Sequence, residues 1–176
     1  MSNLRDKKFI HEALREGAKA LARGDFPVGA VLVINGRVAA KTNNALLSKR
    51  TWGDHAETRL LLDRSKTIRQ ARVKNPKVRI ELYTTLEPCL MCLGCAMLHR
   101  VDRVIFSCPD PRGGVSHMTR ARLPSFYRDN WPSVRGGILK KNAYKMFLRF
   151  MSVQHTKQWK ENKKLFEAMA AKWRES

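Results

Sequence analysis

The chain has 176 residues, of which 43% are hydrophobic, and this length and composition are those of one globular domain with a substantial core. No apolar run approaches the roughly 20 residues of a transmembrane helix, so we expect no membrane partner. Lys and Arg number 35 against 15 Asp and Glu. The resulting net charge of +20 favours polyanionic partners such as nucleic acid, although a merely solvated basic surface would have the same charge.

The N-terminal segment is typical of a helix and not of a targeting peptide. Residues 3–23 place Ile10, Leu14 and Leu21 near one face at helical spacing, and Gly24 ends the segment. The segment holds three acidic residues and lacks the apolar stretch of a signal peptide. We therefore expect a cytoplasmic location.

A β-hairpin is predicted next. Residues 28–34 are apolar and rich in β-branched side chains, as in a buried strand. The Asn-Gly pair at 35–36 is a strong hairpin signal, and residues 37–42 return as the paired strand. Residues 43–53 are polar and typical of a loop, and residues 56–63 are typical of a helix.

The middle of the chain alternates between strand and helix patterns. Residues 64–79 hold seven Lys or Arg and no acid, and we expect a basic connector there. A third strand is predicted at 78–84, a second helix at 89–100, a fourth strand at 101–107 and a loop at 110–114.

The C-terminal part is less regular before it becomes helical. Residues 115–135 suggest a small helix and turns, residues 137–139 an edge strand, and residues from 142 onward a long helix or a helix pair. These elements predict a three-layer α/β/α sandwich with a central mixed sheet of about five strands. We expect a single domain of residues 1–176 that carries a basic helical extension from about residue 140.

One His and two Cys have the spacing of a catalytic zinc site. His55 and Glu57 fall on the first turn of one predicted helix, and Cys89 and Cys92 share a face of the other. Three protein ligands leave the fourth position of zinc open, whereas a structural site is closed by four. Glu57 is near enough to act on a water at the metal without binding the metal. Zinc nucleobase deaminases carry the same H-x-E…P-C-x-x-C pattern.

Other interpretations of the cysteines explain less. Disulfides are disfavoured because three of the four Cys lie within residues 89–95 and a reducing cytoplasm favours thiolates. A thioredoxin-like Cys-x-x-Cys would leave His55 and Glu57 without a role. A structural zinc site would need Cys95 as its fourth ligand, and on a helix Cys95 is poorly placed to bind together with Cys92.

Longer segments around these residues sharpen the interpretation. They are residues 26–33 (FPVGAVLV), 55–57 (HAE), 83–92 (YTTLEPCLMC) and 103–106 (RVIF). With them the chain resembles the cytidine deaminase-like superfamily, and most closely its tRNA-specific adenosine deaminase branch, which forms inosine at the anticodon wobble position. The resemblance covers residues 26–114, with a weaker similarity in the C-terminal helix.

The resemblance implies one zinc ion per chain, held by His55, Cys89 and Cys92. Zinc lowers the pKa of a bound water from 15.7 towards about 7. Glu57 would take the water's proton, pass it to the ring nitrogen beside the attacked carbon, and then protonate the departing amine. A carboxylate suits this role because it must accept and donate a proton within one turnover.

We expect five residues around the substrate, four of them implied by the resemblance. Asn44 matches an Asn that holds the base or ribose, although Asn is also a common turn residue. Val28 and Ala30 match the pocket wall and can serve the strand core as well. Asp110 lies on a loop that approaches the nucleotide, or simply opens a turn before Pro. Trp52 departs from the family's usual lead-in to the His, and we expect it to stack on a base or to pack against the hairpin.

Three substrate classes remain open. They are adenosine in tRNA; free cytosine, guanine or a nucleoside or nucleotide; and cytosine in single-stranded DNA or RNA. Residues from 140 onward hold ten Lys or Arg against three Glu, interleaved with Phe147, Phe150, Trp159 and Trp173, which favours tRNA. The same aromatic residues would also suit a helix packed on the sheet. The presence of Glu57 argues against an inactive RNA-binding relative, and the resemblance implies a homodimer.

Overall fold

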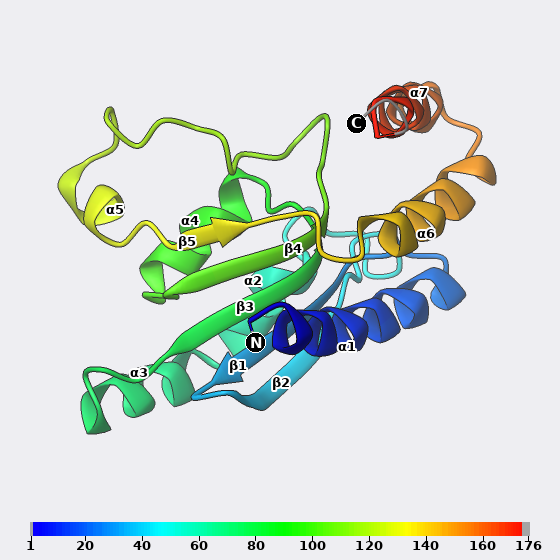
Figure 1. Ribbon diagram of the computed structural model, residues 1–176. Helices are drawn as coiled ribbons and strands as arrows, with labels where there is room; N and C mark the ends of the chain where they lie inside the picture. The colour runs from blue at the N-terminus through cyan, green and yellow to red at the C-terminus, as the bar shows by residue number, and fades with distance from the viewer. Residues whose placement is uncertain (1, 174–176) are drawn as a thin grey trace.

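The computed structural model describes residues 2–173 and contains a five-stranded mixed sheet (Figure 1). The strand order is β2-β1-β3-β4-β5, in which β1 pairs antiparallel with β2 and β3, and β4 pairs parallel with β3 and β5. The sheet confirms the α/β class and the strand number expected from the sequence. The strands span Gly29–Ile34 (β1), Arg37–Asn43 (β2), Ile80–Leu86 (β3), Arg103–Cys108 (β4) and Ser133–Arg135 (β5).

Helices cover both faces of the sheet, as the predicted three-layer sandwich requires. Figure 1 shows α1 and α6 on one side of the sheet and α2 and α4 on the other, and α7 packs on α6. The helices of the described residues are Ser2–Arg23 (α1), Ala56–Asp63 (α2), Ser65–Lys74 (α3), Leu90–Leu98 (α4), Ser125–Asp129 (α5), Lys140–Ser152 (α6) and Lys157–Ala171 (α7).

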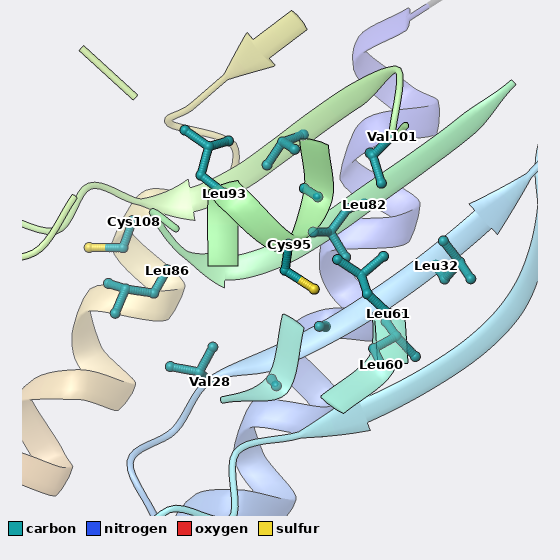
Figure 2. Packing of buried hydrophobic residues seen from close by; sticks show 14 of the residues in the cluster. Val28, Leu32, Leu60, Leu61, Leu82, Leu86, Leu93, Cys95, Val101 and Cys108 are labelled. Carbon is teal, nitrogen blue, oxygen red and sulfur yellow. The ribbon is translucent and has the colours of Figure 1, made fainter. Parts of the chain in front are cut away.

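The side chains of the central strands divide between two hydrophobic cores, because successive strand residues point to opposite faces. Val31 and Tyr83 belong to the core beneath α1, whereas Leu32 and Leu82 belong to the core beneath α2 and α4. Figure 2 shows the second core, where side chains of the sheet meet those of α2 and α4. This core seats the two helices that carry the expected metal ligands.

Two carboxylates are buried between α1 and the sheet and are paired with arginines. Asp6 of α1 and Glu81 of β3 are both fully buried. Arg103 of β4 contacts both, at 3.2 Å from Asp6 Oδ2 and 2.5 Å from Glu81 Oε1. Arg5 lies 2.6 Å from Glu81, and Arg135 lies 3.4 Å from Asp6. Because an unpaired buried charge is costly, this network disfavours any other position of α1 on the sheet.

Two local predictions are wrong. Residues 64–79, expected to be a connector, contain helix α3, of which a single side chain, Ile68, is buried while the basic side chains remain outside the core. The edge strand is Ser133–Arg135 and not 137–139, where the backbone instead turns through a positive-φ glycine. The small helix expected within residues 115–135 is present as α5.

The C-terminal segment is a helix pair, one of the two alternatives predicted for it. Phe147 and Phe150 of α6 are buried, and Phe166 of α7 packs on Phe147 with ring centroids 5.7 Å apart. Arg174 and Glu175, which contribute to the charge of the tail, lie outside the described residues. None of the described helices has the length and apolarity that crossing a bilayer requires.

Candidate metal centre and active site

The side chains of His55, Cys89 and Cys92 meet where helices α2 and α4 begin. His55 is the N-cap residue of α2, and Cys89 is the N-cap residue of α4. Each therefore lies just before the first helical turn on which we expected it. His55 Nδ1 lies 3.7 Å from Cys89 Sγ and 3.5 Å from Cys92 Sγ. One potential ligand atom from each of the three residues lies within 4.8 Å of the other two.

The donor set of this cluster fits a zinc ion. Imidazole nitrogen and thiolate sulfur are preferred zinc ligands, and three of them leave the fourth tetrahedral position open. A hydrogen bond from the Cys92 thiol, together with the neighbouring His55, lowers the pKa of Cys89 and so favours its thiolate. Within residues 2–173 no further His, Cys, Asp or Glu joins the cluster. Cys95 Sγ instead lies 3.6 Å from His99 Nδ1.

Glu57 stands beside the three side chains of this cluster as a buried carboxylate. Its residue is only 3% exposed, and this burial raises the pKa of the carboxyl group. The hydroxyl of Thr84 on β3 donates to Glu57 Oε1 at 2.8 Å, while Glu57 Oε2 lies 3.6 Å from Cys92 Sγ. Glu57 is thus close to the metal cluster without being part of it, as a proton-transferring group requires.

A cavity of about 240 Å³ opens onto these groups. It is lined by four of the five residues that we expected around the substrate, namely Val28, Asn44, Trp52 and Asp110. The fifth, Ala30, is fully buried in the core and lies outside this lining. Besides the metal cluster and Glu57, the remaining lining residues are Phe26, Leu46, Leu86, Glu87, Gln158 and Trp159.

Comparison with known proteins identifies this arrangement. Residues 4–108 match the family model described as the cytidine and deoxycytidylate deaminase zinc-binding region. The chain belongs to this deaminase family. The matched region includes Glu57 and the cluster of His55, Cys89 and Cys92 that fits a zinc site, and zinc is accordingly the cofactor of this hydrolytic nucleobase deaminase.

Relatives extend the similarity beyond the matched region. The tRNA-specific adenosine deaminase of Bacillus subtilis is 33% identical over 162 residues, which cover 92% of this chain and 98% of the relative. That of Haemophilus influenzae is 29% identical and covers 93% of this chain and 90% of the relative.

Solved structures share the fold. One comes from a study of A-to-I editing by tRNA:A34 deaminases at the wobble position of transfer RNA. It matches with a TM-score of 0.59 and 30% identity, over 79% of this chain and 98% of that one. A guanine deaminase from Nitrosomonas europaea has the same fold, with a TM-score of 0.59 at 17% identity over 82% of this chain and 83% of its own.

The residues that we expect to contact the substrate differ in their burial and in their hydrogen bonds. Asn44 is buried, and its Oδ1 accepts the backbone N–H of Leu46 at 2.7 Å. Asp110 Oδ1 accepts the N–H of Arg112 at 2.9 Å, and burial raises the pKa of this carboxyl group. Trp52 is 88% exposed, so its ring is not packed against the hairpin.

Glu87 lines the cavity and binds the loop that carries Asp110. This buried carboxylate accepts the N–H of Asp110 at 3.0 Å, and the N–H and hydroxyl of Ser116 at 3.0 and 2.5 Å. Gly114 lies so close that a Cβ there would collide with the carboxylate. In the sequence, Glu87 is marked only by its place before Pro88 in the matching segment 83–92.

Helix α7 closes another side of the cavity through Gln158 and Trp159. The Trp159 ring lies 5.1 Å from that of Phe26 and 5.0 Å from that of Phe150. Trp173 packs on Tyr144, with ring centroids 5.4 Å apart. The tail aromatics therefore pack within the fold, and Trp159 is the one that also reaches the cavity.

Proposed function

We propose that this protein is a zinc-dependent deaminase that converts adenosine to inosine in tRNA. The observation that carries the proposal is Glu57, a buried carboxylate held beside three zinc-binding side chains and facing a cavity. Adenosine in tRNA is supported by the relatives named tRNA-specific adenosine deaminase.

The proposed reaction is a hydrolysis in which Glu57 carries the proton. Zinc held by His55, Cys89 and Cys92 would supply the Lewis acidity that makes water nucleophilic near neutral pH. Glu57 accepts a proton from this water and delivers it to the ring nitrogen beside the attacked carbon; it then takes the proton of the newly attached hydroxyl and passes it to the departing amine. Oxygen from water replaces the amino group and ammonia leaves, so no electron donor or acceptor is needed.

Four cavity residues are proposed to hold the substrate. The Oδ1 atom of Asn44 already accepts the Leu46 N–H, which leaves the amide N–H₂ to donate to the base edge or the ribose. Val28 forms an apolar wall beside the base. Trp52 would stack on a nucleotide at the cavity mouth, and Asp110 would approach the nucleotide backbone.

A polynucleotide substrate is supported by basic residues on both segments that border the cavity. The loop at 110–122 and helix α7 are joined by a hydrogen bond of 2.5 Å from Arg112 Nη1 to Asn162 Oδ1. Each segment also carries exposed cations that can contact phosphates on either side of the target nucleotide. These exposed residues are Arg112, Arg120, Arg122, Lys157, Lys160 and Lys164.

A substrate panel tests the proposal. Purified protein is offered tRNA, single-stranded DNA of the same loop sequence, and free bases and nucleosides, and the products are analysed by mass spectrometry. We expect a gain of about 1 Da at adenosine in tRNA, because an amino group is replaced by oxygen. Reaction of free bases alone, or of cytosine in DNA alone, would contradict the tRNA assignment and identify one of the other two classes.

We further propose that each chain is a single deaminase domain and that two chains form a homodimer in the cytoplasm. Large apolar side chains on α2 and α4 are more than half exposed, and a second copy of the chain would cover them; they are Leu62, Leu90 and Leu98. Sedimentation equilibrium should give the mass of two chains, and Leu98→Lys should shift it towards one.

A further inference from the structure

Thr84 is a polar residue in an apolar row of the sheet. On β3 it lies between Leu82 and Leu86, which share its face and belong to the core beneath α2 and α4. Thr84 is 0% exposed. A buried hydroxyl is costly unless it is hydrogen-bonded, so the partner of Thr84 accounts for its presence in this row.

That partner is the Glu57 carboxylate. Thr84 Oγ1 lies 2.8 Å from Glu57 Oε1, and because an ionised carboxylate only accepts hydrogen bonds, the hydroxyl is the donor. Glu57 Oε1 is thereby occupied. The other oxygen, Oε2, lies on the side of the metal cluster, 3.6 Å from Cys92 Sγ. The two oxygens of Glu57 therefore have different tasks available to them.

The backbone around Thr84 is rigid enough to fix this hydrogen bond. Thr84 pairs with Ala30 on one side and with Phe106 on the other, in the middle of the sheet. Ala30 directly opposes Thr84 and presents only a methyl group beside it. The small side chain leaves room for the Thr84 hydroxyl to reach Glu57, which gives Ala30 a role although it does not line the cavity.

We propose that Thr84 is a positioning residue that occupies Oε1 of Glu57, so that the proton moved during deamination is carried on Oε2. The first proton of water passes through Oε2 to the ring nitrogen, and the second, from the hydroxyl now bonded to the ring carbon, passes through Oε2 to the leaving amine, with Oε1 held by Thr84 throughout. This inference rests on the proposed function, in which Glu57 transfers the proton.

Substitution of Thr84 tests the inference. Thr84→Val keeps the side-chain shape and removes the hydroxyl, and we expect kcat to fall about 10- to 100-fold, as for other partners that orient groups at metal sites. KM should remain near the wild-type value because Thr84 lies outside the cavity lining. Thr84→Ser should restore most of kcat, and the solvent deuterium isotope effect on kcat should be larger in Thr84→Val than in the wild type.

The neighbouring Thr85 offers a matched control. Its hydroxyl is also buried, but it donates to Pro27 O at 3.2 Å and accepts the Gly29 N–H at 3.1 Å. Thr85→Val thus loses a buried hydroxyl without touching Glu57. We expect Thr85→Val to unfold at lower temperature yet to keep kcat and the isotope effect, when both are normalised to zinc-loaded protein.

Three outcomes would overturn the inference. They are a wild-type kcat in zinc-loaded Thr84→Val, an equal loss of kcat in Thr85→Val, and a Thr84→Ser variant as slow as Thr84→Val. All variants are assayed on the substrate that the wild type deaminates, so a failure of the tRNA assignment is seen separately. Glu57→Ala is assayed in parallel, and activity in that variant would refute the proposed proton transfer by Glu57, whereas absence of deamination by the wild type on every substrate of the panel would refute the proposed function.

Discussion

His55 and Cys89 occupy equivalent positions at the starts of two different helices. Each is the capping residue with extended backbone, and they are 34 residues apart in sequence, yet His55 Nδ1 and Cys89 Sγ are separated by 3.7 Å. The positive ends of the dipoles of α2 and α4 therefore converge on the metal cluster. This field favours thiolates, the form in which cysteine binds zinc.

Cysteine substitutions should separate the metal ligands from the cysteine beside them. Cys92→Ser should lower the zinc content well below about one ion per chain, because a hydroxyl is a poor substitute for a thiolate at zinc. Cys95→Ser should retain zinc, since Cys95 faces His99 and lies outside the cluster. Metal analysis of both purified variants checks this, and equal zinc loss in the two would contradict the assigned ligands.

Glu57→Ala should separate metal binding from catalysis. The variant should bind zinc as the wild type does, because Glu57 is outside the ligand set. Deamination should fall by at least about 10²- to 10⁴-fold, the usual contribution of a general acid–base group. Zinc content and single-turnover rates measured on the same preparation give both values, and retained activity would rule out the mechanism.

Trp52 is expected to affect binding of the polynucleotide more than the chemical step. Base stacking on an aromatic side chain is worth roughly 1–3 kcal/mol, so Trp52→Ala should raise KM for tRNA roughly 5- to 150-fold with little change in kcat. Phe126→Ala is a matched control, because Phe126 is also exposed but lies on α5 outside the cavity lining. An equal effect of the two substitutions would argue against stacking on Trp52.

The value of kcat/KM for tRNA should fall steeply as the salt concentration rises. If cations of α7 contact phosphates, the logarithm of kcat/KM should fall linearly with the logarithm of salt concentration, and Lys160→Gln should reduce the slope by about one. Lys66→Gln removes a similar charge from α3, at the opposite end of the molecule (Figure 1), and should leave the slope unchanged. A salt-independent rate would count against a polyanionic substrate.

Asp25 makes the stability of the fold depend on acid. Its fully buried carboxylate accepts the N–H groups of Leu47 and Ser48, both at 2.9 Å, and Arg23 Nε at 2.7 Å. Burial alone would raise the pKa of Asp25, but these hydrogen bonds outweigh it and lower the pKa below its usual 3.8. The stabilisation that the Asp25 carboxylate provides is therefore fully present at pH values above 3.8, and it is lost as the pH falls through the pKa of Asp25 in the folded state.

Asp25→Asn should accordingly lower the free energy of unfolding by roughly 1–3 kcal/mol at neutral pH. The difference from the wild type should narrow once the pH falls below the usual pKa of 3.8. Urea unfolding of both proteins across this pH range measures the difference. Asp129→Asn, at an exposed position, provides the control, and a difference for Asp25→Asn that is independent of pH would contradict the assignment.

The elements that are predictable from the sequence are those with strong local patterns. Helix Ala56–Asp63 has the bounds that its leucines predict. Helix α3 is not predictable in this way because a single buried residue, Ile68, leaves no apolar period. Strand β5 has three residues, none fully buried, and it exists through pairing with β4, which is a tertiary contact that no local pattern specifies.

The same distinction applies to the site. His55, Glu57, Cys89 and Cys92 are predictable because each pair lies within one short motif. Thr84 and Glu87 stand in the matching segment too, but their roles depend on partners 27 and 29 residues away, Glu57 and Ser116. Trp159 reaches the cavity only because α7 folds back over α6, which the amphipathic pattern of the tail does not specify.

The starts of α2 and α4, which hold the expected zinc ligands, are 34 residues apart in sequence. Zinc would therefore bind the folded chain in preference to the unfolded chain. The unfolded chain cannot hold His55 against the two cysteines, so binding shifts the folding equilibrium by mass action. Free zinc at about 1,000 times its dissociation constant would add roughly 4 kcal/mol to the stability of the fold. The steady-state amount of this protein in a cell would then follow the zinc supply, and marginal variants would survive or be degraded according to it.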